Sequence, residues 1–206
     1  MEDRAGRALI LRLRGVGESD LLVDLFGDRL GRITALAKGA KRSKKRFTGR
    51  LLTGQLIAPA LLPTKNPELP LLESAQVEER FLGLRTDYRR LLAAGPIWEL
   101  LLRVIPAGAV EPAALALALA TLGRQAGARP DEAVSALVIF LVRLLDLLGY
   151  GLHLKGCLAC GRAMDKVKRP RLSPEGGLVC EHCPPPSAGR RKCRPAWPGG
   201  FWPPRP

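Results

Sequence analysis

Four cysteines near the C-terminal end of the sequence have a spacing that suits metal binding. They form two Cys-x-x-Cys pairs, Cys157 with Cys160 and Cys180 with Cys183, separated by nineteen residues. Each pair places two thiolates on one face of a tight turn, and two such turns complete the tetrahedral shell of a structural zinc site. We therefore predict one structural Zn²⁺ bound by these four cysteines.

Other uses of these cysteines fit the sequence poorly. A thioredoxin-like dithiol needs one pair at a helix N-terminus in a βαβ unit, and a zinc deaminase needs an H-x-E element upstream of its cysteines. Only His153 and His182 are present, neither begins such an element, and we expect His182 to face solvent. The sequence also shows neither clustered carboxylates suited to a metal nor a nucleophile–histidine pair. We predict that the protein is not an enzyme.

A second distinctive stretch, GRITALAKGAKRSKKRFTGR (residues 31–50), carries positive charge without a carboxylate. No Asp or Glu occurs between Asp28 and Glu68. Crowding of one sign is unfavourable unless phosphates neutralise it, whereas a solvated surface mixes both signs. We predict contacts to a nucleic-acid backbone from seven side chains of this stretch. They are Arg32, Lys38, Lys41, Arg42, Lys44, Lys45 and Arg46.

The composition of the whole chain supports a polyanionic partner. Its 206 residues carry a formal net charge of +14, while aromatic residues make up only 5%. Because Phe47 is the one aromatic residue in the basic stretch, contact with phosphates should dominate over base stacking, and sequence specificity should be low. A zinc-ribbon protein that binds RNA or the ribosome fits the same features and remains an alternative.

The sequence shows no signal of secretion or membrane insertion. The N-terminal residues MEDRAGRALILRLR lack a long apolar region, and Arg143 and Asp146 interrupt the longest apolar stretch. In a reducing compartment, five cysteines are more plausible as ligands or free thiols than as disulfides. We expect a cytoplasmic protein.

Short apolar runs separated by turn signals predict strands in the first part of the chain. The run ALILRLR places Leu9, Leu11 and Leu13 on one predicted face. Pro59 should make the fourth run an edge strand or a bulged one. Five strands with one long basic connection after the third predict a small barrel of the OB type.

From residue 78 the apolar spacing becomes helical. Gly95-Pro96 predicts a break between two helices, and Pro112 suits the first turn of another. For the last helix, Asp131 is the predicted N-cap and Gly149 the stop.

This last helix is apolar on nearly every side, so it is either buried on several sides or presents a surface to a partner. Its predicted core stripe consists of Val134, Leu137, Val138, Leu141, Leu145 and Leu148. Ile139, Phe140 and Leu147 lie off this stripe.

The predicted architecture is α+β and multidomain. Residues 1–77 form an N-terminal OB-fold β-barrel that binds DNA, 78–152 a central α-helical domain, and 153–183 a four-cysteine zinc module. The Pro/Arg-rich tail, 184–206, has no helical or strand period, so we expect it to be disordered.

Three stretches, in this order, resemble the RecO family of bacterial recombination mediators. They are GESDLLVDLFGDRLGRITALAKGAKRSKKRF, LHLKGCLACG and LSPEGGLVCEHC. The resemblance runs from about Leu11 to Cys183, and the basic stretch combined with the late cysteine pairs is more specific than either alone. In the family a further helical stretch follows the second cysteine pair, whereas a Pro/Arg/Trp tail follows it here.

The resemblance implies an OB-fold, a helical domain, a zinc module and a non-enzymatic role in DNA repair and recombination. It implies binding of single- and double-stranded DNA, annealing of strands coated by single-strand-binding protein, and, with RecR, assistance in loading RecA in the RecF-type pathway. It further implies that the helical domain binds the acidic, apolar C-terminal tail of single-strand-binding protein. The implied location is cytoplasmic and nucleoid-associated.

Overall fold

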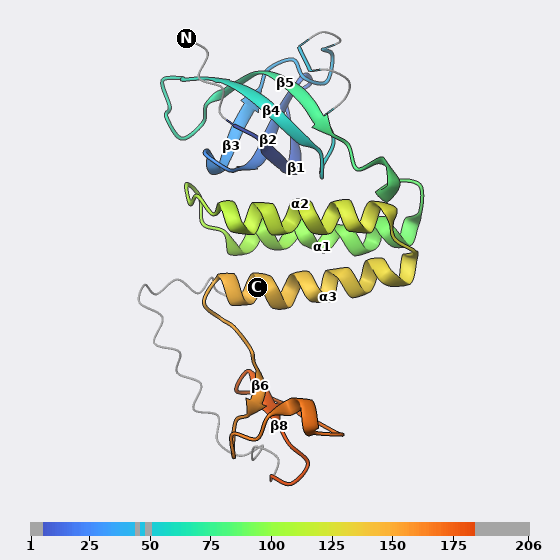
Figure 1. Cartoon of the computed structure of the whole chain (residues 1–206). Coiled ribbons are helices and arrows are strands. Elements are labelled where there is room, and N and C mark those ends of the chain that lie inside the picture. The colour runs from blue at the N-terminus through green and yellow to red at the C-terminus, as the bar shows by residue number, and fades with distance from the viewer. Residues whose placement is uncertain (1–5, 44–45, 48–50, 184–206) are drawn as a thin grey trace. The chain divides into compact units, whose positions relative to one another are not determined.

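A computed structural model describes residues 6–43, 46–47 and 51–183. The predicted DNA contacts Lys44 and Lys45, and the tail from residue 184, lie outside the described residues. The chain divides into two compact units, Met1–Gly151 and Leu152–Pro206. The first unit contains a barrel and three helices, and the second contains the paired cysteines (Figure 1).

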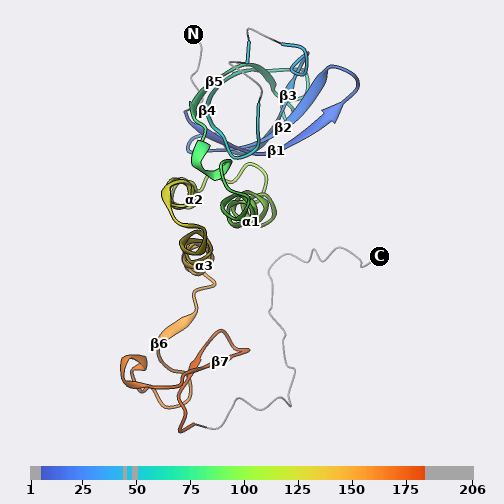
Figure 2. The same cartoon turned by 90° about the vertical axis from the view of Figure 1, so that its right-hand side faces the viewer.

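The first unit begins with a closed five-stranded barrel in the order β1-β2-β3-β5-β4, visible end-on in Figure 2. Its strands are β1 (Ala8–Val16), β2 (Asp20–Gly27), β3 (Gly31–Ala37), β4 (Leu56–Leu62) and β5 (Leu71–Glu79). Antiparallel hairpins join β1 to β2 and β2 to β3, and β3 meets β5 in parallel. The barrel and the long connection after β3 confirm the predicted OB-like fold.

A β-bulge in β1 changes the direction of its side chains. The pairing with β2 shifts between Ile10 and Arg12, so Leu11 is the extra residue. Leu9 and Leu11 belong to the core shared with the helices, whereas Leu13 packs against the barrel interior. The prediction that Leu9, Leu11 and Leu13 share one face is wrong because the bulge reverses the alternation.

Strand β4 is bulged and partly unpaired, as Pro59 predicts. It pairs with β1 only at Leu56 and Ile57, so Pro59 has a strand partner, Ala75, on the β5 side alone. The register with β5 shifts twice, between Leu56 and Ile57 and between Ala60 and Leu61. Proline has no backbone N–H to donate, so this half-open position tolerates it.

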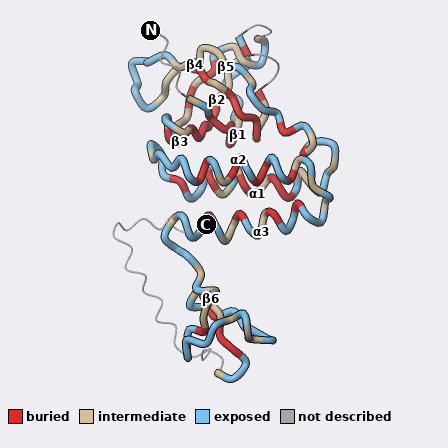
Figure 3. Tube along the Cα trace, in the orientation of Figure 1, coloured by how far each residue is buried: buried red, intermediate tan, exposed pale blue. Residues whose placement is uncertain are grey.

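Three stacked helices follow a 3₁₀ turn (Leu82–Leu84). The first two lie against the barrel, and the third packs on the first two (Figure 1). They are α1 (Tyr88–Val104), α2 (Pro112–Gly127) and α3 (Pro130–Leu147). Buried residues of the barrel and of the helices form one core there, and the trace of buried residues is red in Figure 3. No helix in the described part of the chain has the length and apolar content needed to cross a membrane.

Helix α1 runs without a break through Pro96, so the predicted division at Gly95-Pro96 is wrong. The side chain of Asp87 caps its start by accepting N–H bonds from Arg89 and Arg90. Ala94 precedes the proline and Ile97 follows it, and both are fully buried in the same core. This tertiary packing on both sides of Pro96 outweighs the lost helical hydrogen bond.

Helix α3 buries only part of the predicted stripe, because Leu137, Leu141 and Leu148 pack against the core while other members face away from it. Its buried residues are Ala133, Ala136, Phe140 and Leu144. Val134 and Val138, expected in the core stripe, are 53% and 54% exposed. The prediction is wrong for Val134, Val138 and the off-stripe Phe140, because periodicity alone does not select the inward face of a helix that is apolar on nearly every side.

The prediction for the C-terminal end of α3 is confirmed, and the prediction for its N-terminal end is wrong. Gly149 follows the helix with a φ of +82° and ends it, as predicted. Asp131, the predicted N-cap, instead lies in the first turn, because Pro130 begins the helix and Arg129 precedes it. The carboxylate of Glu132 accepts the backbone N–H of Arg129 at 3.1 Å.

The second unit contains a three-stranded sheet and a short 3₁₀ turn (Met164–Lys166). Its strands are β6 (His153–Cys157), β7 (Arg171–Ser173) and β8 (Gly177–Val179). Cys157, Val179 and Cys180 are the buried core residues. So small a core needs a cross-link or a metal ion to hold it together.

Candidate nucleic-acid interface and metal centre

The four paired cysteines converge in one cluster. Their Sγ atoms all lie within 4.8 Å of one another, and those of Cys160 and Cys180 are 3.8 Å apart. Zn–S bonds of about 2.3 Å in a tetrahedron give sulfur–sulfur edges of about 3.8 Å, whereas a disulfide measures about 2.05 Å. All four are free thiols. The cluster fits the predicted four-thiolate zinc module.

Two short turns position these thiols. Cys157 is the last residue of β6, and its carbonyl accepts the N–H of Gly161 at 2.8 Å, where a φ of +72° lets the chain turn back. Cys180 directly follows β8, and its carbonyl accepts the N–H of Cys183 at 3.3 Å. His182, inside the second pair, has an exposed side chain and is not part of the cluster, as predicted.

The thiols of the cluster differ in their affinity for protons. The backbone N–H of Cys180 lies 3.4 Å from Sγ of Cys157 and lowers the pKa of Cys157 to about 6. Hydrogen bonds with Cys160 and Cys180 raise the pKa of Cys183 to about 12. One position thus favours the thiolate while another retains its proton. A divalent cation removes this conflict because it stabilises all four thiolates.

Basic side chains of the second unit offset the charge of the thiolates. Residues 152–183 contain six Lys or Arg and three Asp or Glu, and four thiolates with one divalent cation carry a charge of −2. The guanidinium of Arg171 donates to the carbonyls of Cys180 and Cys183. The positive charge of this unit is therefore largely balanced locally. A phosphate-binding surface is thus expected on the barrel.

The basic connection, residues 38–55 between β3 and β4, is anchored to the barrel at several points. Near its start, Oδ1 of Asp20 accepts the N–H of Gly39 at 2.8 Å, and this bond lowers the pKa of Asp20. Farther along, Phe47 is 1% exposed in the barrel core, with the Arg46 guanidinium 5.7 Å from its ring centre. The described predicted contacts Lys38, Lys41, Arg42 and Arg46 are exposed along this anchored connection.

The turn between β1 and β2, residues 17–20, lies against the same connection. Lys41 donates its backbone N–H to the carbonyl of Ser19 at 3.0 Å and its Nζ to the carbonyl of Gly17 at 2.8 Å. Arg42 donates to Oε2 of Glu18 at 3.3 Å. The sequence analysis missed Glu18 and Asp20. The only signal was two acidic residues about twenty residues before the partners that they contact.

Arg32 lies apart from the other predicted contacts. It is near the beginning of β3, and Lys38 directly follows the end of that strand, about 20 Å away at 3.3 Å per residue. Its Nε donates to the carbonyl of Ile105 just after α1, and its backbone pairs with Gly108 and Ala109. Arg32 therefore joins the barrel to the α1–α2 loop.

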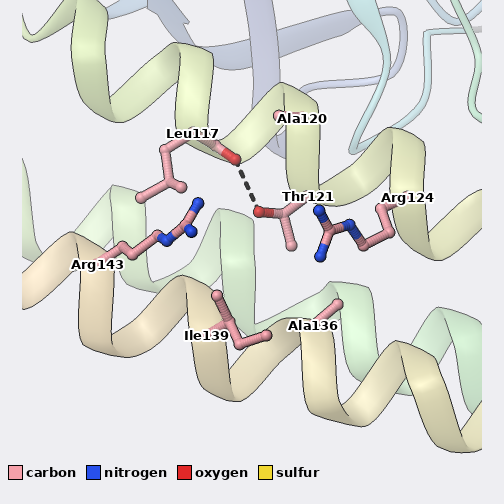
Figure 4. A pocket seen from close by; sticks show the side chains of 7 residues that line it. All are labelled: Leu117, Ala120, Thr121, Arg124, Ala136, Ile139 and Arg143. Carbon is pink, nitrogen blue, oxygen red and sulfur yellow. Dashed lines mark hydrogen bonds between the residues drawn. The ribbon is translucent and has the colours of Figure 1, made fainter.

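An open pocket lies between α2 and α3, with apolar walls and two arginines at its rim (Figure 4). Its lining residues are Leu117, Ala120, Thr121, Arg124, Ala136, Ile139 and Arg143. The Thr121 hydroxyl donates to the carbonyl of Leu117, so it is already satisfied. The guanidinium groups of Arg124 and Arg143 have no hydrogen-bond or ion-pair partner within the described ranges. The apolar walls and the two arginines together suit a ligand that has both apolar groups and negative charge.

Known proteins match nearly the whole chain. The family model described as "Recombination protein O N terminal" matches residues 1–81, and "Recombination protein O C terminal" matches residues 85–195.

Several relatives carry the name "DNA repair protein RecO". The one from Syntrophobacter fumaroxidans is 34% identical over 184 residues, which cover 89% of this chain and 71% of the relative. Those from Rhodopirellula baltica and Geobacter metallireducens are 33% and 31% identical, over 66% and 73% of their own lengths. The two family models match the N- and C-terminal parts of the chain in the expected order, and the structure has a barrel, three helices and a four-cysteine cluster. The chain belongs to the RecO family of DNA repair proteins.

Proposed function

We propose that this chain is a DNA-binding recombination mediator. It binds single- and double-stranded DNA, anneals complementary strands coated by single-strand-binding protein and, with RecR, assists the loading of RecA. The observation that carries this proposal is the anchored basic connection. It holds Lys38, Lys41, Arg42 and Arg46 exposed beside the barrel in a run free of carboxylates.

The mechanism is neutralisation of phosphates on two strands at once. Bound lysine and arginine side chains release counterions and lower the repulsion between the strands, so base pairing supplies the specificity. Phe47, the aromatic residue of the connection, is buried in the barrel and does not offer a stacking surface. This favours contact with the DNA backbone over base recognition.

The direct test is annealing of complementary oligonucleotides precoated with single-strand-binding protein, with and without the chain. We expect the chain to accelerate annealing, and structured RNA to compete less effectively than single-stranded DNA. An unchanged rate contradicts the mediator function. Stronger binding of structured RNA supports the alternative of an RNA- or ribosome-binding protein.

Glu18→Gln should tighten the binding of single-stranded DNA by about two- to fivefold. Glu18 pairs with Arg42 in the free protein, and a phosphate must displace this exposed carboxylate. Exposed ion pairs contribute at most about 1 kcal/mol, which limits the gain to about fivefold. Fluorescence anisotropy with a labelled oligonucleotide measures the change. Glu111→Gln, beside α2, is the charge-matched control, and an equal gain there would show that only net charge matters.

We assign the α2–α3 pocket to the acidic, apolar C-terminal tail of single-strand-binding protein. Apolar tail residues enter between Leu117 and Ile139, while Arg124 and Arg143 pair with its carboxylates.

Arg124→Ala with Arg143→Ala should weaken binding of a tail peptide at least tenfold, since charged hydrogen bonds contribute about 1.5–3 kcal/mol each. Isothermal titration calorimetry measures this loss. Arg89→Ala with Arg103→Ala, which removes two exposed arginines of α1, should leave peptide affinity within about threefold of the original. Equal losses from both pairs would refute the assignment.

We further propose that the cysteine cluster binds Zn²⁺ in a structural role. Four thiolates fill a tetrahedral shell and leave no position for a substrate, so the metal stabilises its module and the chain acts without turnover. A DNA-cleaving activity that depends on Mg²⁺ or Mn²⁺ and co-purifies with the chain would contradict this role.

A further inference from the structure

On the outward face of the barrel, one buried carboxylate holds two half-exposed arginines. The side chain of Asp24 in β2 is 2% exposed, whereas those of Arg12 and Arg14 in β1 are 48% and 45% exposed. Nε of Arg12 donates to Oδ2 of Asp24 at 2.8 Å, and Nη2 of Arg14 donates to Oδ1 at 3.3 Å. The hydroxyl of Thr34 in β3 donates to the same Oδ1 at 2.6 Å. Side chains of three neighbouring strands thus meet at one carboxylate.

This carboxylate remains ionised and fixed. Burial acts to raise the pKa of Asp24, but hydrogen bonds from Thr34 and Arg12 and the charge of Arg14 together lower the pKa below its usual value. Each arginine gives Asp24 a single donor nitrogen, so the other donors of each guanidinium remain for a ligand. One carboxylate also balances only one arginine, which leaves a net positive charge at this surface.

Arg12 and Arg14 share one face by the alternation of the strand, and the bulge before them turns that face outward. They are two residues apart, about 6.6 Å along the strand, and Leu13 between them packs toward the barrel interior. The helices cover the earlier part of this outward face, at Leu9 and Leu11, where the shared core lies.

The arginine pair is continuous with the basic connection. Arg14 precedes Gly15, and Nζ of Lys41 lies 3.1 Å from the position that a Cβ on Gly15 would occupy. Positive side chains therefore follow one another from Arg12 through Arg14 to Lys41 and Arg42. Arg12 and Arg14 could not be singled out from the sequence, because Asp24 and Thr34 lie more than nine residues away.

We propose that Arg12 and Arg14, oriented by Asp24, form a phosphodiester-binding extension of the basic connection. A single nucleic-acid strand held by Lys38, Lys41 and Arg42 continues along β1, and successive phosphates accept paired N–H bonds from the two guanidinium forks. This inference rests on the proposed function, because it extends the path of the same strand.

The first test replaces both arginines by glutamine, whose amide nitrogen takes the place of Nε and so can still donate to Asp24 from position 12. Arg12→Gln with Arg14→Gln should lower the salt slope of binding by about 1.4 and the affinity at 0.1 M salt about 25-fold, as expected for two fewer phosphates on a single strand. The loss should grow with the length of a homopolymeric oligonucleotide, since a short one is held by the basic connection alone. Fluorescence anisotropy over a length series measures both effects.

A charge-matched control lies at the opposite end of β1. Arg7 precedes that strand and Arg29 is in the β2–β3 turn, and both are exposed. Arg7→Gln with Arg29→Gln should change affinity less than about threefold at every length. An equal loss from this pair would overturn the proposal, because net charge alone would then explain the result.

The second test asks whether Asp24→Asn raises or lowers the affinity for DNA. Asp24→Asn adds one positive charge to the protein, so binding should become tighter if the arginines act as unoriented charges. Orientation by Asp24 predicts the reverse, a loss of at least threefold in affinity for long oligonucleotides. Thermal denaturation verifies that the variant is folded, and if it is not, the glutamine pair decides the question.

The outcomes separate this proposal from the proposed function. If the original protein binds no single-stranded DNA, the proposed function fails. If it does bind, and the Arg12→Gln, Arg14→Gln variant matches it at every oligonucleotide length, only the extension is wrong.

Discussion

Combined replacement of Lys38, Lys41 and Arg42 by alanine is expected to weaken single-stranded DNA binding about a hundredfold at 0.1 M salt. The three side chains are exposed on the connection that Asp20 and Phe47 anchor to the barrel. Each lost phosphate contact lowers the log–log salt slope by about 0.7, so three contacts lower it by about 2. Binding titrations at several salt concentrations measure both quantities. The loss should be similar for unrelated base sequences, since backbone contacts dominate.

A matched triple variant removes the same charge elsewhere in the first unit. Arg29→Ala, Arg89→Ala and Arg103→Ala replace exposed arginines in the β2–β3 turn and on α1. Only a small effect on affinity is expected from this variant. If it loses as much affinity as the Lys38, Lys41, Arg42 variant, the basic connection is not the binding site.

Cys157→Ser should abolish metal binding and unfold the second unit. Elemental analysis should find about one zinc per chain in the original protein and nearly none in the variant. Structural zinc contributes about 10–16 kcal/mol in small zinc-binding peptides, far more than a core of Cys157, Val179 and Cys180 supplies. Hydrogen exchange should therefore show loss of protection across residues 152–183, while the barrel remains protected.

Cys193→Ser is the control for this loss, because Cys193 belongs to neither Cys-x-x-Cys pair and lies outside the described residues. It should retain zinc. DNA affinity of the Cys157→Ser variant should stay within about threefold of the original, since the basic residues of the second unit offset thiolates. Full zinc content in that variant, or a protected second unit after chelation, would contradict the structural role of the metal.

Features encoded by nearby residues were predictable from the sequence. Two Cys-x-x-Cys pairs specify a tetrahedral site through local turns, and alternation of apolar residues specifies short strands, so both the cluster and the barrel are confirmed. The same holds for the stop of α3, where Gly149 adopts a positive φ.

Features set by distant contacts were not predictable. Pro96 lies inside a helix because Ala94 and Ile97 pack on one core, and α3 turns Phe140 inward because α1 and α2 pack against that side. A bulge at Leu11 redirects Leu13, although nothing in the local pattern marks it.

The candidate DNA site shows the same limit. The exposed cations of the basic connection are apparent from composition, but the carboxylates that anchor this connection and orient Arg12 and Arg14 are not. Asp20 and Asp24 act on partners ten or more residues away, and the bond of Arg32 to Ile105 spans 73 residues. The charge pattern of the sequence therefore identifies the basic residues. It does not distinguish those of the basic connection from Arg32, which joins the barrel to the helices.

The most direct test of the account is the salt dependence of single-stranded DNA binding by the unmodified chain. Contact with about five phosphates predicts a log–log slope of about −3.5, independent of base sequence. A slope near zero, or binding that depends strongly on sequence and little on salt, would contradict the claim that the basic connection acts by neutralising phosphates.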